Sequence, residues 1–266
     1  MKPHAHHERR GHGLAARTAV AAAWALAFLA GAGVCAASDT LLAAPDRTEA
    51  VALESFDAYP VGGFPDAWKV RGDMRDARAI YRITADGSGG RFLAAHADRQ
   101  SVMIGLEHPF EPSRYPYLRW RWRVQQCPNG ADERRKATND SAAGVYVIFP
   151  GRFFVPRVLK YVWSTTAPVG TRESSPAASN TKIIVLESGA RGEPAWRTAT
   201  VNVQQDYAVL FGEPAPAARG IGILTDGNDT DSVAAADYAD FQLLTAAVEP
   251  PGAALTHAEA AVPVAH

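Results

Sequence analysis

Three arginines and two tryptophans alternate in one short stretch of the sequence, LRWRWRV at residues 118–124. Successive side chains of a β-strand point to opposite faces, so Arg119, Arg121 and Arg123 share one face and the tryptophans share the other. Guanidinium groups bind carboxylates, sulfates and phosphates through paired hydrogen bonds. This arginine ladder is either a solvated back face or the floor of a binding groove. We expect the groove, with Tyr146 beside the ladder.

Two carboxylates could carry out acid–base chemistry. Glu187 lies near the end of the strand-like run IIVLES, and Asp140 precedes the strand that follows a long polar loop. A glycosidase needs two such groups about 5–10 Å apart across a sugar. Alternatively, Glu187 pairs with an arginine of the ladder and has a structural or ligand-positioning role. We expect this second role for Glu187.

Oxygen-bearing side chains gather in TDGNDTDS, residues 225–232. Asp226, Asn228 and Asp231 offer the hard oxygen ligands that Ca²⁺ prefers. The same residue types are also the usual formers of turns. Calcium is the one cofactor that the sequence indicates, and no other is expected.

Histidine and cysteine chemistry finds little support. Only His96 and His108 lie in the central part of the chain, and no G-x-S-x-G motif is present. Cys127 stands alone in a loop, which favours a surface thiol over a nucleophile. These observations disfavour a Ser-His-Asp hydrolase, a zinc site and an internal disulfide framework. The formal net charge of −1 gives no reason to expect binding to nucleic acid or to a membrane surface.

Short, alternating strand-like runs must position these residues. About a dozen such runs, separated by Gly, Pro, Asp and Asn, lie between residues 50 and 245, and only 204–212 has a helical pattern. This spacing predicts one all-β domain, an antiparallel β-sandwich of the jelly-roll type with one short helix. A closed barrel is the alternative. Two long polar loops, 125–144 and 165–180, are expected to overhang one sheet.

Both ends of the chain differ from this domain. Residues 1–37 have basic residues, an apolar run at 19–33 and then small residues, the pattern of a secretory signal peptide. We therefore expect export to the periplasm or the medium, with no membrane span after signal cleavage. Cys35 has a poor context for lipidation, so a lipoprotein is the lesser alternative. Residues 246–266 are rich in Ala and Pro and are expected to form a disordered tail.

The order of motifs resembles a bacterial family. LRWRWRV is followed by Lys136, Asn139 and Asp140, and then by VYVIF, YVWS, IIVLESG and GIGILTDGNDT. This order, over residues 52–244, resembles the exported family called domain of unknown function 3047. The resemblance implies a fold and a compartment, and it supplies no reaction. Members tend to have paired acidic residues where this chain has Asn139 and Asp140, so a two-carboxylate role there is in doubt.

The first and last motifs of the domain, SFDAYPVGGFPDAW and DYADFQLL, resemble a second group of proteins. They are similar to the terminal strands of lectin-like and carbohydrate-binding jelly rolls, of the concanavalin or galactose-binding kind. A resemblance at the level of the fold implies a sandwich and says little about a site.

Together these features predict an exported β-sandwich protein that binds a saccharide or another polar or anionic molecule of the cell envelope. The predicted ligand contacts are Arg119, Arg121, Arg123, Tyr146 and Glu187. A carbohydrate-active enzyme of the glycosidase or lyase type, using Glu187 and Asp140, is the second hypothesis. A structural module for an unknown protein partner is the third.

Overall fold

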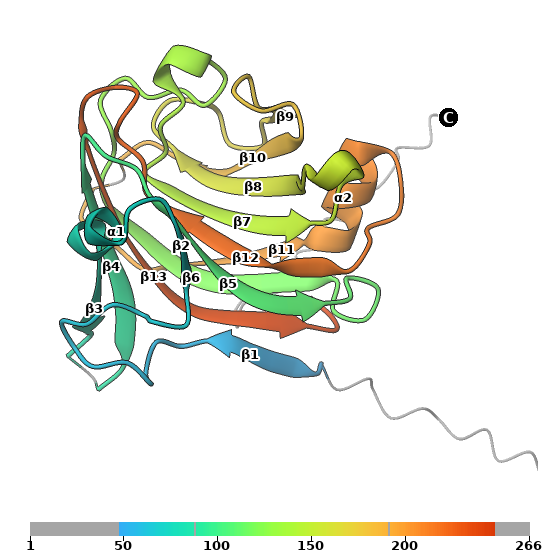
Figure 1. The fold of residues 1–266 in the computed structure, drawn as a ribbon, viewed down its shortest axis with the longest axis horizontal. Coiled ribbons are helices and arrows are strands. Elements are labelled where there is room, and N and C mark those ends of the chain that lie inside the picture. Colours follow the sequence, from blue (N-terminus) through green and yellow to red (C-terminus); the bar gives the residue numbers. More distant parts are fainter. Residues whose placement is uncertain (1–47, 88, 191, 248–266) are drawn as a thin grey trace, which may run out of the picture. The chain divides into compact units, whose positions relative to one another are not determined.

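The computed structural model describes residues 48–247, apart from positions 88 and 191. The predicted signal peptide, and the predicted tail from residue 248 onward, lie outside the described residues. The described chain forms two β-sheets that pack face to face (Figure 1). The all-β sandwich predicted from the sequence is therefore confirmed.

The first sheet, sheet A, has a long central strand, β13, paired on both sides. Its strands are ordered β11 (Arg197–Asn202), β6 (Tyr117–Gln126), β13 (Val233–Leu244), β4 (Arg91–Asp98) and β3 (Tyr81–Ala85), with β1 (Ala50–Glu54) also paired to β13.

The second sheet, sheet B, has seven strands. Their order is β2 (Lys69–Arg71), β5 (Met103–Phe110), β12 (Ala218–Leu224), β7 (Ala143–Phe149), β8 (Arg157–Ser164), β10 (Thr181–Ser188) and β9 (Arg172–Ser174). Neighbouring strands of the described sheets are antiparallel except β8 and β10, which are parallel. The predicted loop 165–180 is the connection between these two strands, and it contains β9.

Two α-helices are present among the described residues, α1 (Met74–Ile80) and α2 (Val203–Phe211), where the sequence predicted only the second. Asp73 is the N-cap of α1, since its carboxylate accepts a 2.6 Å hydrogen bond from the backbone N–H of Arg75. β3 begins at Tyr81, directly after the last residue of α1. Two 3₁₀ turns, η1 (Lys136–Thr138) and η2 (Arg152–Phe154), lie in loops.

Aromatic side chains fill the centre of the space between the sheets. Trp120 and Trp122 of β6 are buried and pack edge to face, with ring centres 5.2 Å apart. Trp120 also contacts Tyr161 of sheet B, and Trp122 contacts Trp163. Each large aromatic side chain removes about 150–250 Å² from water, so this cluster is a principal source of stability. The tryptophan side of the LRWRWRV strand is therefore core, and its arginine side faces outward.

No helix in the described part of the chain is long and apolar enough to cross a membrane.

Candidate functional site

The arginine ladder lies on the outer face of sheet A, where most of its charge is paired. Arg123 donates a 2.6 Å hydrogen bond to Asp237 of β13, and Arg121 forms an ion pair with Asp240. The ring of Trp196 covers both guanidinium groups, whose central carbons lie 5.0 Å (Arg121) and 4.7 Å (Arg123) from its centre. These ion pairs and the cation–π contacts link β6 to β13 and to the segment before β11. The ladder is thus largely neutralised from within the protein.

Asp240 reaches the ladder through an irregularity in β13. The pairing of β13 with β6 shifts register between Ala239 and Gln242, and Asp240 has a positive φ of 54°. An Asp in this left-handed region carries strain of about 1–3 kcal/mol. A bulge of this kind re-aims a side chain, and here it serves the ion pair with Arg121.

Tyr146 does not lie beside the ladder, which corrects the predicted grouping. It belongs to β7 of sheet B, and its neighbours Val145 and Val147 point into the core. Because side chains alternate along a strand, Tyr146 lies on the outer face of sheet B. The ladder and Tyr146 are therefore on opposite outer faces of the sandwich. The prediction failed because β6 and β7, although consecutive, enter different sheets.

A row of directly paired residues crosses the outer face of sheet B at Tyr146. Gly222 of β12 pairs with Tyr146 on one side and with Gly105 of β5 on the other, and Gly105 pairs with Lys69 of β2. Residues in register on neighbouring strands point to the same face. Gly105 and Gly222 therefore contribute no side chain to this row between Lys69 and Tyr146.

A groove of about 350 Å³ adjoins this row. We call it the glycine groove, because Gly105 and Gly220 lie in its floor. Its other lining residues include Lys69, Arg71, Glu107, Ile148, Pro156 and Arg219. The polar side chains among them are exposed.

The two glycines of the floor are there for different reasons. Gly220 has a φ of 153°, and a Cβ atom there would lie 2.1 Å from the carbonyl oxygen of Leu106. Its backbone therefore excludes any side chain. At Gly105 a Cβ atom would meet nothing closer than the carbonyl oxygen of Ile221, at 3.5 Å. Packing therefore does not demand glycine at 105, and its effect is to leave the floor of the groove without a side chain.

The glycine groove carries an excess of positive charge. Lys69, Arg71 and Arg219 contribute three cations, and Glu107 contributes one carboxylate, a net charge of +2. None of the ion pairs among the described residues, defined by an N···O distance of up to 4.0 Å, involves these four side chains. These cations therefore differ from Arg121 and Arg123, whose charge the protein already pairs. The groove suits an anionic ligand.

Buried carboxylates hold two long loops against one end of sheet B. Asp140 is fully buried and accepts hydrogen bonds from the backbone N–H groups of Asp229 (3.0 Å) and Thr230 (2.7 Å) and from the Thr230 hydroxyl. Glu133, also fully buried, accepts a 2.5 Å hydrogen bond from the hydroxyl of Ser164. Asp140 therefore ties the loop 225–232 to the loop 125–144, which is a structural role.

Asp226 is the most perturbed acid among the described residues. Its pKa is raised to about 7, chiefly by burial; the charge of Lys160 opposes this shift, and the neighbouring Asp140 adds to it. Lys160 is itself buried, and its ammonium group lies 5.8 Å from the centre of the Tyr146 ring. One carboxylate oxygen of Asp226, Oδ1, is buried without a hydrogen-bond partner. The polar cluster of Asp226, Lys160 and Tyr146 lies further along the outer face of sheet B than the glycine groove, and loops cover it.

Glu187 and Asp140 have separate partners. The carboxylate of Glu187 is 4.0 Å from the guanidinium of Arg197, which belongs to β11 of sheet A. Glu187 thus pairs with an arginine, as the alternative interpretation expected, but that arginine is not in the ladder. Both oxygens of Asp140 are occupied by the loop 225–232. These contacts do not bring Glu187 and Asp140 together in one site, as the glycosidase hypothesis would need.

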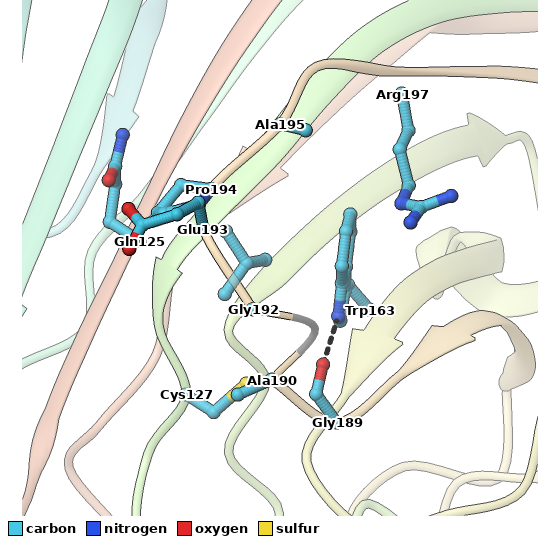
Figure 2. A pocket seen from close by; sticks show the side chains of 11 residues that line it. Gln125, Cys127, Trp163, Gly189, Ala190, Gly192, Glu193, Pro194, Ala195 and Arg197 are labelled. Atoms are coloured by element: carbon cyan, nitrogen blue, oxygen red, sulfur yellow. Dashed lines mark hydrogen bonds between the residues drawn. The ribbon is translucent and has the colours of Figure 1, made fainter.

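A second, smaller pocket is lined by residues 189, 190 and 192–195 together with Trp163 and Arg197 (Figure 2). Trp163 closes one side of it and donates a 3.0 Å hydrogen bond from its indole N–H to the carbonyl oxygen of Gly189. The cavity measures about 40 Å³, which is room for a few water molecules rather than a sugar. Cys127 also lines it, and burial raises the pKa of this thiol, which lowers its reactivity.

The loop 225–232 is organised as a turn. Asp226 is buried, whereas Asn228 and Asp231 are exposed, and the Asn228 amide donates a 3.0 Å hydrogen bond to the Asp229 carboxylate. Within the described residues, no group of three or more His, Cys, Asp or Glu side chains is arranged to hold a metal ion. Calcium binding by Asp226, Asn228 and Asp231 stays a prediction.

Sequence reasoning missed the residues that make the groove. The run MIGLE contains Gly105, and GIGIL contains Gly220 and Gly222, all on the strand face that would carry polar side chains. Missing side chains on an outer face indicate a depression, and this signal was available for Gly105 and Gly220. The neighbouring cations Lys69 and Arg71 gave no comparable signal, because their strand has only three residues.

Comparisons with known proteins identify a family and two distant structures. The family described as "Protein of unknown function (DUF3047)" matches residues 66–242. The K2 cleaved adhesin domain of Lys-gingipain is 12% identical, covering 73% of this chain and 97% of that chain, with a TM-score of 0.38. A thermostable cellulase derived from Cel12A of Rhodothermus marinus is 14% identical, covering 74% and 99%, with a TM-score of 0.33. A search of the curated proteins found no match.

Proposed function

This chain belongs to the family described as "Protein of unknown function (DUF3047)", and we propose that it binds an acidic saccharide in the glycine groove of sheet B. The observation that carries the proposal is the set of three exposed cations around an open glycine floor, none of them in an ion pair of the described residues. The proposal keeps the predicted ligand class and moves the site from the arginine ladder to the opposite sheet.

The shape of the groove supports a ligand of this size. Its volume of about 350 Å³ falls at the lower end of the usual range for small-molecule sites, roughly 300–1,000 Å³. Ile148 and Pro156 offer apolar surface to the C–H face of a sugar ring. Lys69, Arg71 and Arg219 offer donors to its carboxylate or sulfate groups. An acidic sugar presents both kinds of surface at once.

The signal-peptide pattern supports a location in the periplasm or the medium for this binding activity. Acidic saccharides would meet the protein there as components of the cell envelope. Export remains part of the proposal.

Calorimetric titration of the protein with uronic-acid oligosaccharides and with their carboxyl-reduced, neutral counterparts tests the proposal. We expect the acidic oligosaccharides to bind at least tenfold more tightly than the neutral ones. Gly105→Val should abolish binding, because its side chain fills the floor while its Cβ atom makes only an ordinary contact. The matched control is Ala94→Val, a change of similar size on the outer face of sheet A.

Two results would overturn the proposal. One is a folded Gly105→Val protein, with an unchanged melting temperature, that binds the acidic oligosaccharide as the wild type does. The other is the absence of binding by any acidic oligosaccharide at millimolar concentration.

A further inference from the structure

An apolar side chain protrudes from the loop between β7 and β8. Phe153 is 92% exposed, more than any other large apolar side chain among the described residues. Val155, two residues further on, is 51% exposed. An aromatic ring exposed to water forgoes the free energy that its burial would contribute. A single exposed apolar residue needs no explanation, but the backbone beneath this one adds a second cost.

The loop 151–156 holds Phe153 in a strained position. Phe153 has a φ of 52°, in the left-handed region that bulky residues avoid. The turn is closed by a 3.0 Å hydrogen bond from the backbone N–H of Val155 to the carbonyl oxygen of Arg152. A Cβ atom on Gly151 would lie 1.9 Å from the carbonyl oxygen of Val155, so the turn requires glycine there. A tight turn thus presents an aromatic ring to solvent with no gain in packing.

Cations lie in and beside the loop that carries Phe153. Arg152 is exposed, and a hollow of about 280 Å³ beside the loop is lined by Arg152, Val155, Arg157 and Lys182. Arg157 is neutralised by Glu213 and also donates a 2.9 Å hydrogen bond to the Tyr207 hydroxyl. Lys182 contacts the Ser174 hydroxyl at 2.6 Å and has no carboxylate partner among the described residues. Arg152 and Lys182 therefore leave a local surplus of two positive charges.

We infer that the loop 151–156 docks on an anionic phospholipid surface, with Phe153 and Val155 entering the acyl boundary and Arg152 and Lys182 facing the headgroups. A protruding aromatic ring flanked by cations matches the composition of an interfacial membrane anchor. Each Lys or Arg near an anionic bilayer adds electrostatic attraction. A specific protein interface, in contrast, needs about 800 Å² per partner, far more apolar surface than one ring and one valine offer.

The inferred docking of this loop on a membrane does not require that the glycine groove binds a saccharide. The loop shares Pro156 with the rim of the glycine groove, so docking would hold the groove close to the membrane surface. The net charge of the whole chain, −1, does not favour a membrane, and the attraction is local to this loop.

Tryptophan fluorescence of Phe153→Trp in the full chain tests the inference. The variant is mixed with vesicles of phosphatidylglycerol whose acyl chains are brominated, and the quenching is measured relative to the wild type. The control is Val61→Trp, an exposed apolar position in the loop before β2, where the native side chain is 57% exposed. A position-specific signal is needed because the apolar N-terminal run could itself bring the chain to vesicles.

We expect quenching at position 153 to exceed that at position 61 at least threefold, and to fall at least threefold with phosphatidylcholine. Arg152→Gln together with Lys182→Gln should reduce it similarly, and Gly105→Val should leave it unchanged. Equal quenching at the two positions, or none at 153, would overturn the inference. Loss of acidic oligosaccharide binding in Phe153→Ala, without quenching at 153, would also overturn it and assign the loop to the groove.

Discussion

Arg123 and Asp237 lie directly opposite each other on β6 and β13, and a 2.6 Å hydrogen bond joins them. Their side chains are 24% and 7% exposed, so the pair is largely withdrawn from water. Gln125 donates a second hydrogen bond to the same carboxylate oxygen, at 2.9 Å. A carboxylate that is engaged in this way stabilises the sheet, and it leaves the ladder little capacity to bind an external anion.

Asp237→Asn should lower the free energy of unfolding by about 2 kcal/mol. A hydrogen bond to a charged group contributes roughly 1.5–3 kcal/mol, and the change also leaves Arg123 without its counter-charge. Urea unfolding measures the effect. The matched control is Asp98→Asn, whose pair with Arg99 is more than half exposed and should contribute less than about 1 kcal/mol. Equal losses in the two variants would contradict a stabilising role for the arginine ladder.

The stability of the protein should fall as the pH rises through neutrality, because of Asp226. Burial raises its pKa in the folded state to about 7, from an ordinary value of 3.8. Between these pH values the folded protein holds a proton that the unfolded chain has lost, so the contribution of Asp226 to stability is fully present below about pH 4 and is lost above pH 7. The shift corresponds to as much as about 4 kcal/mol.

Asp226→Asn should remove this pH dependence, because the amide does not titrate. Urea unfolding at pH 5 and at pH 8 compares the two proteins. We expect the variant to gain stability relative to the wild type at pH 8. A difference between variant and wild type that is the same at both pH values would contradict the raised pKa.

Two glycines of the groove should respond differently to the same substitution. Gly220→Ala should destabilise the protein by about 2–4 kcal/mol, since its Cβ atom would lie 2.1 Å from a backbone oxygen and φ is 153°. Gly105→Ala should change the stability by less than about 1 kcal/mol, or raise it, because alanine removes backbone entropy from the unfolded chain. Thermal unfolding measures both changes. If Gly105→Ala lowered the stability as much as Gly220→Ala does, packing would require glycine at 105 as well.

Saccharide binding in the glycine groove should depend on charge. Arg71→Gln should weaken the binding of an acidic oligosaccharide about five- to tenfold, which is about 1.0–1.4 kcal/mol. Affinity should also fall as salt rises from 50 to 300 mM, because the cations of the groove are exposed and open to screening. Titration calorimetry provides both measurements.

Arg82→Gln is the matched control for Arg71→Gln. Arg82 is an exposed arginine on the outer face of β3 in sheet A, away from the groove. Its substitution should leave the affinity unchanged. Equal losses in the two variants would point to the charge of the whole protein rather than to the groove.

Sequence reasoning succeeded where the information was local. The alternation of LRWRWRV predicted a buried tryptophan side and an outward arginine side, and both are found. The helix at 204–212 was predicted within one residue at each end. The helix α1 was missed, because its signal is a single Asp73 cap before a seven-residue segment.

Predictions about sites failed where they required knowledge of neighbours. Asp237 and Asp240 pair with the ladder across 114 and 119 positions of sequence. Tyr146 and the ladder were expected together because their strands are consecutive, yet these strands lie in different sheets. No spacing in the chain reveals such long-range pairing.

The sequence by itself determined that this protein is an all-β domain and which face each strand would bury. Strand geometry enforces alternation, and the burial of apolar side chains then selects the inward face. Only the tertiary structure decided which residues share a surface, because strand order depends on how both sheets pack as a whole. It placed two aspartates beside the arginine ladder, and it placed Gly105 and Gly220 in a groove that three cations also line. The first arrangement pairs charge within the protein, and the second leaves charge available to a ligand.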